Sequence, residues 1–295
     1  MELEVKKINL DDWVLSGGGG NGQSYNHKDD PTILLKMNKA SLPKKFAEFE
    51  YLRTDSLYAM GVSCAKVIDL VTDGKRFGLI IEKVKDKRSF ARIISDNPDQ
   101  IVPLAKSFAQ ETRQLHQIRC NNGLIPSYRD EYLKYLSKCR FLSKREKRIL
   151  KDALDAMDDK DYCVHGDLTP GNIIRADGKN FWIDLGDVTY GDPDIDFGNM
   201  MFVSNHVPPK LIEYLYHVSR DQFREFVDAY AHEYFGERWG SQALQEKLQK
   251  VLLVKVGLSV LKHPAAGIIY RPFIKGHKHR YALMRKLMDL FVRKY

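Results

Sequence analysis

The sequence predicts an α+β fold, in which a small β-rich part with one helix precedes a larger, mainly helical part. Residues 1–84 contain short apolar runs separated by turn-forming residues, a pattern typical of strands. From residue 85 onward the apolar residues recur with helical spacing. With 295 residues the chain can bury a sizeable core, and we expect two lobes, 1–84 and 85–295.

The N-terminal part is predicted to consist of strands around a single helix. An apolar run at 13–15 ends in the stretch SGGGGNGQS, and TILLK at 32–36 indicates a buried strand. Apolar residues at helical spacing predict a helix over 42–61, closed by a glycine. Residues 65–84 form two apolar runs around Asp73-Gly74, which is a strong hairpin signal. The expected order is therefore strand, strand, strand, helix, strand, strand.

The C-terminal part is predicted to be mainly helical. VPLAKSFAQETRQLHQI, at 102–118, has the spacing of an amphipathic helix. Ser219 and Gln222 have the spacing of a capping box at the start of a later helix. Further helical segments are expected at 130–157, 194–206, 210–218, 220–235, 242–262 and 280–294.

Charge is unevenly distributed along the chain. The net charge is +8, but residues 241–295 hold twelve Lys and Arg residues against two acidic ones. A basic segment can attract an anionic ligand, a nucleic acid or a membrane surface. A solvated helix face is the simpler interpretation, and we expect neither a nucleic acid nor a membrane as partner.

The sequence predicts a cytoplasmic protein. Its start is charged and lacks the apolar region of a signal peptide. The most apolar later run, 251–261, is too short to span a bilayer and contains Lys255. The four cysteines are scattered without a CxxC pair, which favours reduced thiols over disulfides or a metal site.

Three polar residues around VHGDLTPGNII (164–174) have the spacing of a phosphoryl-transfer site. Asp167 and Asn172 lie five residues apart, and Asp184 follows in the apolar segment FWIDLG. An Asp among apolar residues is costly unless a cation or hydrogen-bond donors compensate its charge. Carboxylate and amide oxygens from Asn172 and Asp184 suit Mg²⁺, and Asp167 could accept a proton from an attacking hydroxyl.

Phosphoryl transfer also needs groups that hold the nucleotide phosphates. Gly17, Gly19 and Gly22 in GGGGNGQS have GxGxxG spacing, and Ser24 completes this candidate phosphate-binding loop. Lys36, at the end of TILLK, is placed to contact the phosphates from a neighbouring strand. The 42–61 helix offers either Glu48 or Glu50 to pair with that lysine.

These motifs resemble the aminoglycoside-phosphotransferase-like family of the protein-kinase-like superfamily. The resemblance rests on HGDLTPGN (165–172), IDLGD (183–187) and YGDPDIDFG (190–198). It implies a two-lobed kinase-like fold with a nucleotide-binding N-terminal lobe. HGD in place of HRD, IDLG in place of DFG and the lack of an APE-like segment argue against a typical eukaryotic protein kinase.

The resemblance also implies roles for individual residues. Asp167 would be the catalytic base, Asn172 and Asp184 would hold Mg²⁺, and Lys36 would contact the phosphates of ATP. Glu48 is favoured over Glu50 as the partner of Lys36, because apolar residues follow it as they follow the family's acid. The backbone of the hinge, Glu82 to Val84, would read adenine.

We therefore expect ATP- and Mg²⁺-dependent transfer of the γ-phosphoryl group to an alcohol of a small molecule. The basic C-terminal segment favours a neutral or anionic acceptor over a polycationic aminoglycoside. One alternative is a protein Ser/Thr kinase or self-phosphorylating regulator. Another is a non-catalytic nucleotide-binding scaffold whose basic tail binds nucleic acid.

Overall fold

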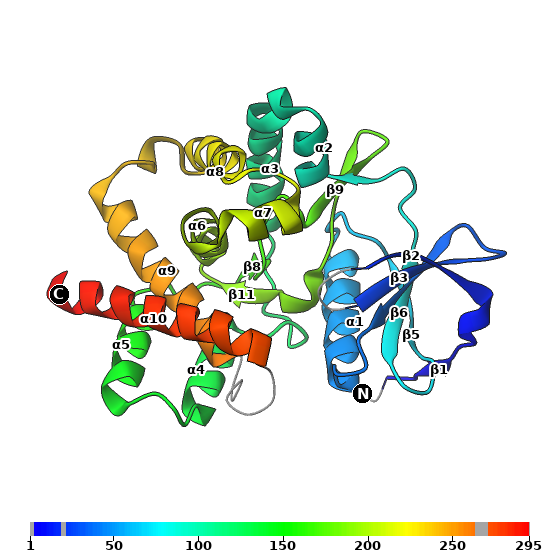
Figure 1. The fold of residues 1–295 in the computed structure, drawn as a ribbon, viewed down its shortest axis with the longest axis horizontal. Coiled ribbons are helices and arrows are strands. Elements are labelled where there is room, and N and C mark those ends of the chain that lie inside the picture. The colour runs from blue at the N-terminus through cyan, green and yellow to red at the C-terminus, as the bar shows by residue number, and fades with distance from the viewer. Residues whose placement is uncertain (1–2, 19–21, 263–270, 295) are drawn as a thin grey trace. The chain divides into compact units, whose positions relative to one another are not determined.

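The structure, a computed structural model, describes residues 3–18, 22–262 and 271–294. Contacts divide the chain into two compact units. The first contains Met1–Phe90 and Pro170–Val188, and the second contains Ala91–Thr169 and Thr189–Tyr295. The first unit holds the large sheet and the second holds most of the helices (Figure 1), which confirms the predicted α+β class. Residues 170–188, placed in the C-terminal lobe by the sequence, thus group with the first unit.

A six-stranded sheet with one helix forms the main part of the first unit (Figure 1). The strand order is β1-β5-β6-β4-β3-β2, and all neighbours are antiparallel except β1 and β5. The predicted order of strands and helix is confirmed by β2, β3, β4, α1, β5 and β6, and the short β1 was not predicted. The elements are β1 (Lys6–Lys7), β2 (Trp13–Gly18), β3 (Gly22–His27), β4 (Ile33–Asn38), α1 (Lys44–Ala59), β5 (Val67–Thr72) and β6 (Phe77–Glu82).

The two faces of this sheet bury different side chains. Leu35 and Met37 alternate along β4 and pack with other core residues on one face. On the other face, Leu79 packs with Ala47 of α1. Lys36 is the register partner of Leu79, so the period of two places the lysine on the face that α1 covers.

Tight backbone contacts fix the strands around that lysine. A Cβ atom built on Gly78 of β6 would lie 2.4 Å from the carbonyl oxygen of Lys36, so only glycine allows β6 to approach β4 this closely. The hairpin before it turns at Asp73-Gly74 as predicted, with Gly74 at φ +92°. The Asp73 carboxylate accepts hydrogen bonds from the backbone amides of Lys75 and Arg76.

A smaller sheet in the first unit positions Asn172 and Asp184, the two predicted metal ligands. Its strand order is β10-β9-β7, formed by β7 (Arg88–Ser89), β9 (Ile173–Ala176) and β10 (Lys179–Trp182). The β9–β10 hairpin turns at Asp177-Gly178, both of which have positive φ. Asn172 lies just before β9, and Asp184 lies two residues after β10. The hairpin therefore returns the chain so that the two residues come from neighbouring strand ends.

The second unit is built from helices and one small strand pair. Phe108 of α3 contacts Phe226 and Tyr230 of α8, with ring centroids 5.5 and 5.4 Å apart. A large core cluster joins α4, α5, α9 and α10. The elements are α2 (Phe90–Asp96), α3 (Ile101–Leu115), α4 (Tyr128–Lys138), α5 (Lys144–Asp155), β8 (Tyr162–Val164), β11 (Thr189–Gly191), α6 (Phe197–His206), α7 (Pro209–Tyr216), α8 (Arg220–Phe235), α9 (Gln242–Leu261) and α10 (Arg271–Lys294).

The predicted helices are present with shifted bounds, and α2 was not predicted. The basic region 130–157 is two helices, because the chain leaves helical geometry at Cys139 and restarts at the Ser143 capping box. The last helix begins at Arg271, not at 280. The capping box of Ser219 and Gln222 is confirmed. No described helix is long and apolar enough to cross a membrane.

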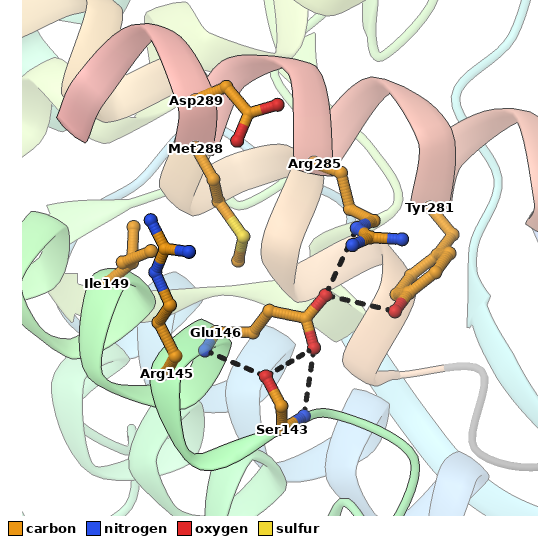
Figure 2. A pocket seen from close by; sticks show the side chains of 8 residues that line it. All are labelled: Ser143, Arg145, Glu146, Ile149, Tyr281, Arg285, Met288 and Asp289. Atoms are coloured by element: carbon orange, nitrogen blue, oxygen red, sulfur yellow. Dashed lines mark hydrogen bonds and ion pairs between the residues drawn. The ribbon is translucent and has the colours of Figure 1, made fainter. Parts of the chain in front are cut away.

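A cavity of about 270 Å³ lies between α5 and α10 in the second unit (Figure 2). Glu146 is bonded on several sides. Its carboxylate accepts hydrogen bonds from the Ser143 amide (2.8 Å) and the Tyr281 hydroxyl (3.0 Å), and Arg285 Nε lies 3.4 Å away. These bonds tie α10 to the start of α5.

Candidate functional site

Lys36 of β4 is the centre of the polar site in the first unit. Its Nζ donates to Oε1 of Glu50 on α1 at 2.6 Å and also to Oδ1 of Asp184. Burial opposes the charged form of the amine, but the two carboxylates outweigh it and raise the Lys36 pKa above its ordinary value. The lysine is therefore held as a cation between a helix and the segment after β10.

The partner of Lys36 is Glu50, so the predicted pair with Glu48 is wrong. Glu48 bonds Lys44 of its own helix instead, at 3.0 Å. Residues two apart on a helix point in directions about 200° apart, so only one of the two can face the sheet. Glu50 is buried at 6% exposure, and Gly186 lies against its side chain, with a built Cβ 3.6 Å from the Glu50 Cβ and Cγ.

Asp184 lies where the chain leaves the small sheet. Its backbone has φ 57° and ψ 50°, the left-handed region that is strained for a residue with a side chain. The side chain is about half-exposed, at 53%. Arg53 of α1 donates to the carbonyl oxygen of Gly186, which ties the segment after Asp184 to the helix. Sequence reasoning missed Arg53, although it lies three residues after Glu50 on the same helix face.

A backbone hydrogen bond links Asn172 to Ile183, the residue before Asp184. The Ile183 amide donates to the Asn172 carbonyl oxygen at 3.0 Å, and Asn172 itself is 9% exposed. An aspartate carboxylate and an asparagine amide together present hard oxygen ligands, which fit Mg²⁺. The described residues contain no group of three or more His, Cys, Asp or Glu that could hold a metal alone. A magnesium ion here would thus need nucleotide phosphates or water as further ligands.

The candidate phosphate-binding loop joins β2 to β3. Strand register aligns Gly17 with Ser24, and Ser24 with Lys36, so these three predicted residues form one row across the sheet. A Cβ atom on Gly22 would lie 2.2 Å from the Met37 carbonyl oxygen, so this position requires glycine. Gly19 lies outside the described residues.

The predicted hinge follows the end of β6. The Glu82 amide donates to the Lys66 carbonyl oxygen at 2.9 Å, and the Lys83 amide donates to that of Thr32 at 2.7 Å. Adenine recognition through either of these two amides would have to break a backbone hydrogen bond. Val84, the third hinge residue, is half-buried.

Asp167 belongs to a loop that the second unit holds by its backbone. The buried carboxylate of Asp196 accepts from the amides of His165 (2.6 Å) and Gly166 (2.8 Å), and from the His116 ring (3.0 Å). Gly166 has φ +81°, which explains a glycine before Asp167. His165 is fully buried, in line with a structural role. His116 and Asp196 thus support the backbone of this loop.

Two further side chains contact this loop, and sequence reasoning missed the part that they play. Asn199 of α6 donates from Nδ2 to Asp167 Oδ1 at 2.9 Å. Lys255 of α9 donates to the carbonyl oxygen of Gly166 at 2.6 Å. The only signal for Lys255 was a charge within the apolar run VLLVKVGLSVL.

The predicted site residues are therefore distributed over both units. Lys36, Asn172 and Asp184 belong to the first unit, and Asp167 belongs to the second. The chain passes from the second unit to the first between Thr169 and Pro170. The structure groups the predicted phosphate and metal ligands, and separately defines the loop of the predicted base.

Comparison with known proteins finds one family. Residues 14–246 match APH, described as the phosphotransferase enzyme family. A comparison with curated proteins finds no match.

Solved structures of similar fold agree with this result. A choline/ethanolamine kinase family protein from Mesorhizobium loti has 16% identity and a TM-score of 0.57, over 94% of this chain and 88% of its own. The aminoglycoside phosphotransferase APH(4)-Ia has 12% identity and a TM-score of 0.60, over 96% and 93%. The amicoumacin kinase hAmiN, in complex with AMP-PNP, Ca²⁺ and Ami, has 15% identity and a TM-score of 0.60, over 97% and 90%. The predicted protein-kinase-like fold is confirmed.

Proposed function

Because the chain belongs to the phosphotransferase enzyme family, we propose that it transfers the γ-phosphoryl group of ATP to an alcohol of a small molecule. The reaction depends on Mg²⁺, and the acceptor is a sugar, a nucleoside, an amino alcohol or a similar metabolite. The observation that carries the proposal is the pair of bonds from Lys36 to Glu50 and Asp184. A lysine fixed beside a metal-binding carboxylate is what nucleotide phosphates require in kinase-like enzymes.

Each predicted residue has one task in this reaction. Lys36 binds the nucleotide phosphates, and Gly17 and Ser24 lie in its row on the sheet. Asn172 and Asp184 hold Mg²⁺, which neutralises phosphate charge when it is bound. The residues Gly22, Glu82 and Val84 complete the nucleotide-binding set.

Asp167 receives the acceptor. Its carboxylate accepts the proton of the acceptor hydroxyl while the new bond forms between that oxygen and the γ-phosphorus. The bond between the γ-phosphorus and the β,γ-bridging oxygen breaks, and ADP leaves. The task of the protein is mostly to position these groups, since phosphoryl transfer requires little covalent chemistry from side chains.

Charge near the loop of Asp167 supports a neutral or anionic acceptor. Lys255 places an ammonium on the carbonyl oxygen of Gly166, the residue before Asp167. The rest of the basic C-terminal segment says less about the acceptor. For example, Lys247 is bonded to Asp192 at 2.7 Å and Asp194 at 2.8 Å, so its charge is already compensated.

A screen of ATP consumption tests the proposal. The protein is incubated with Mg²⁺ and ATP against alcohol-bearing metabolites, aminoglycosides and casein, with Asp167→Ala as the blank. We expect one class of small alcohols to stimulate ADP formation in the wild type and not in the variant. Phosphorylation of casein or of the chain itself would favour the protein-kinase alternative, and no turnover with any acceptor would contradict the proposal.

A further inference from the structure

The side chain of Asn199 contacts the predicted catalytic base directly. We propose that Asn199 is a positioning residue, whose bond to Oδ1 of Asp167 sets the orientation of that carboxylate toward the acceptor hydroxyl. This inference rests on the proposed function, in which Asp167 accepts the hydroxyl proton. It adds a residue 32 positions away in the sequence that sets the orientation of that carboxylate.

The orientation of the Asn199 amide follows from its partners. Nδ2 lies 2.9 Å from Asp167 Oδ1 and 3.4 Å from the Leu168 carbonyl oxygen. Both partners are hydrogen-bond acceptors, so the NH₂ group and not the amide oxygen must face them. Asn199 is only 6% exposed, so water competes little for these bonds.

Asn199 shares its helix face with the residue that holds the loop backbone. Asp196 lies three positions before Asn199, and its φ of −63° and ψ of −33° are helical. Residues at this spacing lie on the same side of a helix. Asp196 binds the amides of His165 and Gly166, and Asn199 binds the next side chain in the loop. One helix start thus fixes both the backbone and the carboxylate of the loop.

The position of Asn199 relative to the loop of Asp167 depends on the close packing of α6 against α9. A Cβ atom on Gly198 would lie 2.8 Å from Cγ1 of Val251 and 3.2 Å from Cβ of Lys255. Only glycine therefore allows the two helices to approach to this distance. Lys255 of the same α9 surface donates to the Gly166 carbonyl oxygen. The closely packed helices α6 and α9 therefore each hold the loop with one side chain, Asn199 and Lys255 respectively.

The hydrogen bond matters because a base must present its lone pair in one direction. Rotation of the Asp167 side chain would carry the accepting oxygen away from the hydroxyl. A misplacement of about 1 Å can cost about a hundredfold in rate. The bond from Asn199 restricts this rotation without touching the nucleotide ligands Lys36 and Asp184. Its loss should therefore lower kcat and leave the KM for ATP nearly unchanged.

Three variants separate a donor from a space-filling residue. Asn199→Asp keeps the shape but replaces the NH₂ donor by an acceptor, Asn199→Ala removes both, and Asn205→Ala changes an exposed asparagine of the same helix. We expect Asn199→Ala to lower kcat about 10- to 100-fold, with the KM for ATP within about twofold. Asn199→Asp should lose at least as much, and Asn205→Ala should behave as the wild type. Wild-type kcat in Asn199→Asp would overturn the proposal.

A spectroscopic measurement tests the contact independently of activity and of any folding defect in the Asn199 variants. In wild-type protein labelled with ¹³C and ¹⁵N, the side-chain amide signals of Asn199 and Asn205 are assigned through the Cβ and backbone atoms of each residue. The Asn199 signals should shift in Asp167→Ala, whereas the Asn205 signals should not. Unshifted Asn199 signals would overturn the positioning role, even in an active enzyme. A clear shift in a protein without phosphotransfer would instead retain the contact and refute the proposed function.

Discussion

The ammonium of Lys36 lies 2.6 Å from Oε1 of Glu50 and is also bonded to Asp184. One cation therefore joins the sheet, the helix α1 and the segment after β10. The side chain is fixed in this arrangement by the protein itself, and both carboxylates favour its charged form. A lysine held in this way suits the phosphate-binding role that we propose for Lys36.

Loss of the Glu50 carboxylate should impair nucleotide use. We expect Glu50→Gln to lower kcat/KM for ATP about 10- to 100-fold, because a hydrogen bond to a charged group contributes about 1.5–3 kcal/mol. Glu48→Gln is the matched control on the same helix. It removes only a bond to Lys44 near the surface, so kcat/KM should stay within about twofold. Steady-state kinetics measures both variants. Equal losses of kcat/KM in the two would contradict the assignment of Glu50 as the functional partner of Lys36.

The glycine-rich loop offers a second matched pair, read out by stability. Gly22→Ala would place a methyl group 2.2 Å from the Met37 carbonyl oxygen, and the sheet backbone cannot move away easily. We expect it to lower the free energy of unfolding by about 2 kcal/mol. A Cβ on Gly17 would have no atom within 4 Å, so Gly17→Ala should change that free energy by less than about 0.5 kcal/mol. Urea denaturation measures both, and equal midpoints would show that the strand register differs.

The metal assignment of Asp184 predicts a change in magnesium dependence. Asp184→Asn keeps the size of the side chain but removes the negative charge that a divalent cation requires. We expect the Mg²⁺ concentration for half-maximal turnover to rise about tenfold or more, at saturating ATP. Asp187→Asn, three residues later and also exposed, is the control. An unchanged Mg²⁺ dependence in Asp184→Asn would remove the metal role.

Local patterns sufficed to predict most elements of the fold. Alternation and Gly-containing turns located β4 and the β5–β6 hairpin. The motif spacing singled out Asp167, Asn172 and Asp184, whose roles in the reaction stay predictions. The choice between Glu48 and Glu50 could not be made in this way. It depends on how α1 is rotated against the sheet, which is set by tertiary packing such as the contact of Gly186 with Glu50.

The roles of Asn199 and Lys255 were equally beyond the sequence. Each contacts the loop of Asp167 from a helix that lies 32 to 89 residues further along the chain. Neither lies in a motif that predicts contact with the base. Their positions follow from the approach of α6 to α9 at Gly198, which becomes visible only in three dimensions.

The buried carboxylate of Asp196 should make stability depend on acid pH. Burial raises its pKa, but the hydrogen bond from His116, the charges of both histidines and the His165 amide outweigh it, so the pKa lies below its ordinary value. Asp196→Asn should lower the free energy of unfolding by about 3 kcal/mol at pH 7, because it removes one partner from a buried network.

The sign of the pH effect follows from that depressed pKa. The unfolded chain takes up the proton first, near pH 3.9, so the contribution of Asp196 is complete above this pH and is lost as the pH falls through the native pKa. Urea unfolding of the wild type and Asp196→Asn should therefore show a constant difference from pH 7 to 5 that narrows below about pH 4. Asp221→Asn, at a carboxylate that is 94% exposed, should show no such narrowing. The prediction would be contradicted if the difference in unfolding free energy between wild type and Asp196→Asn stayed unchanged down to pH 2. Protonation of Asp196 would then not weaken its bonds to the loop.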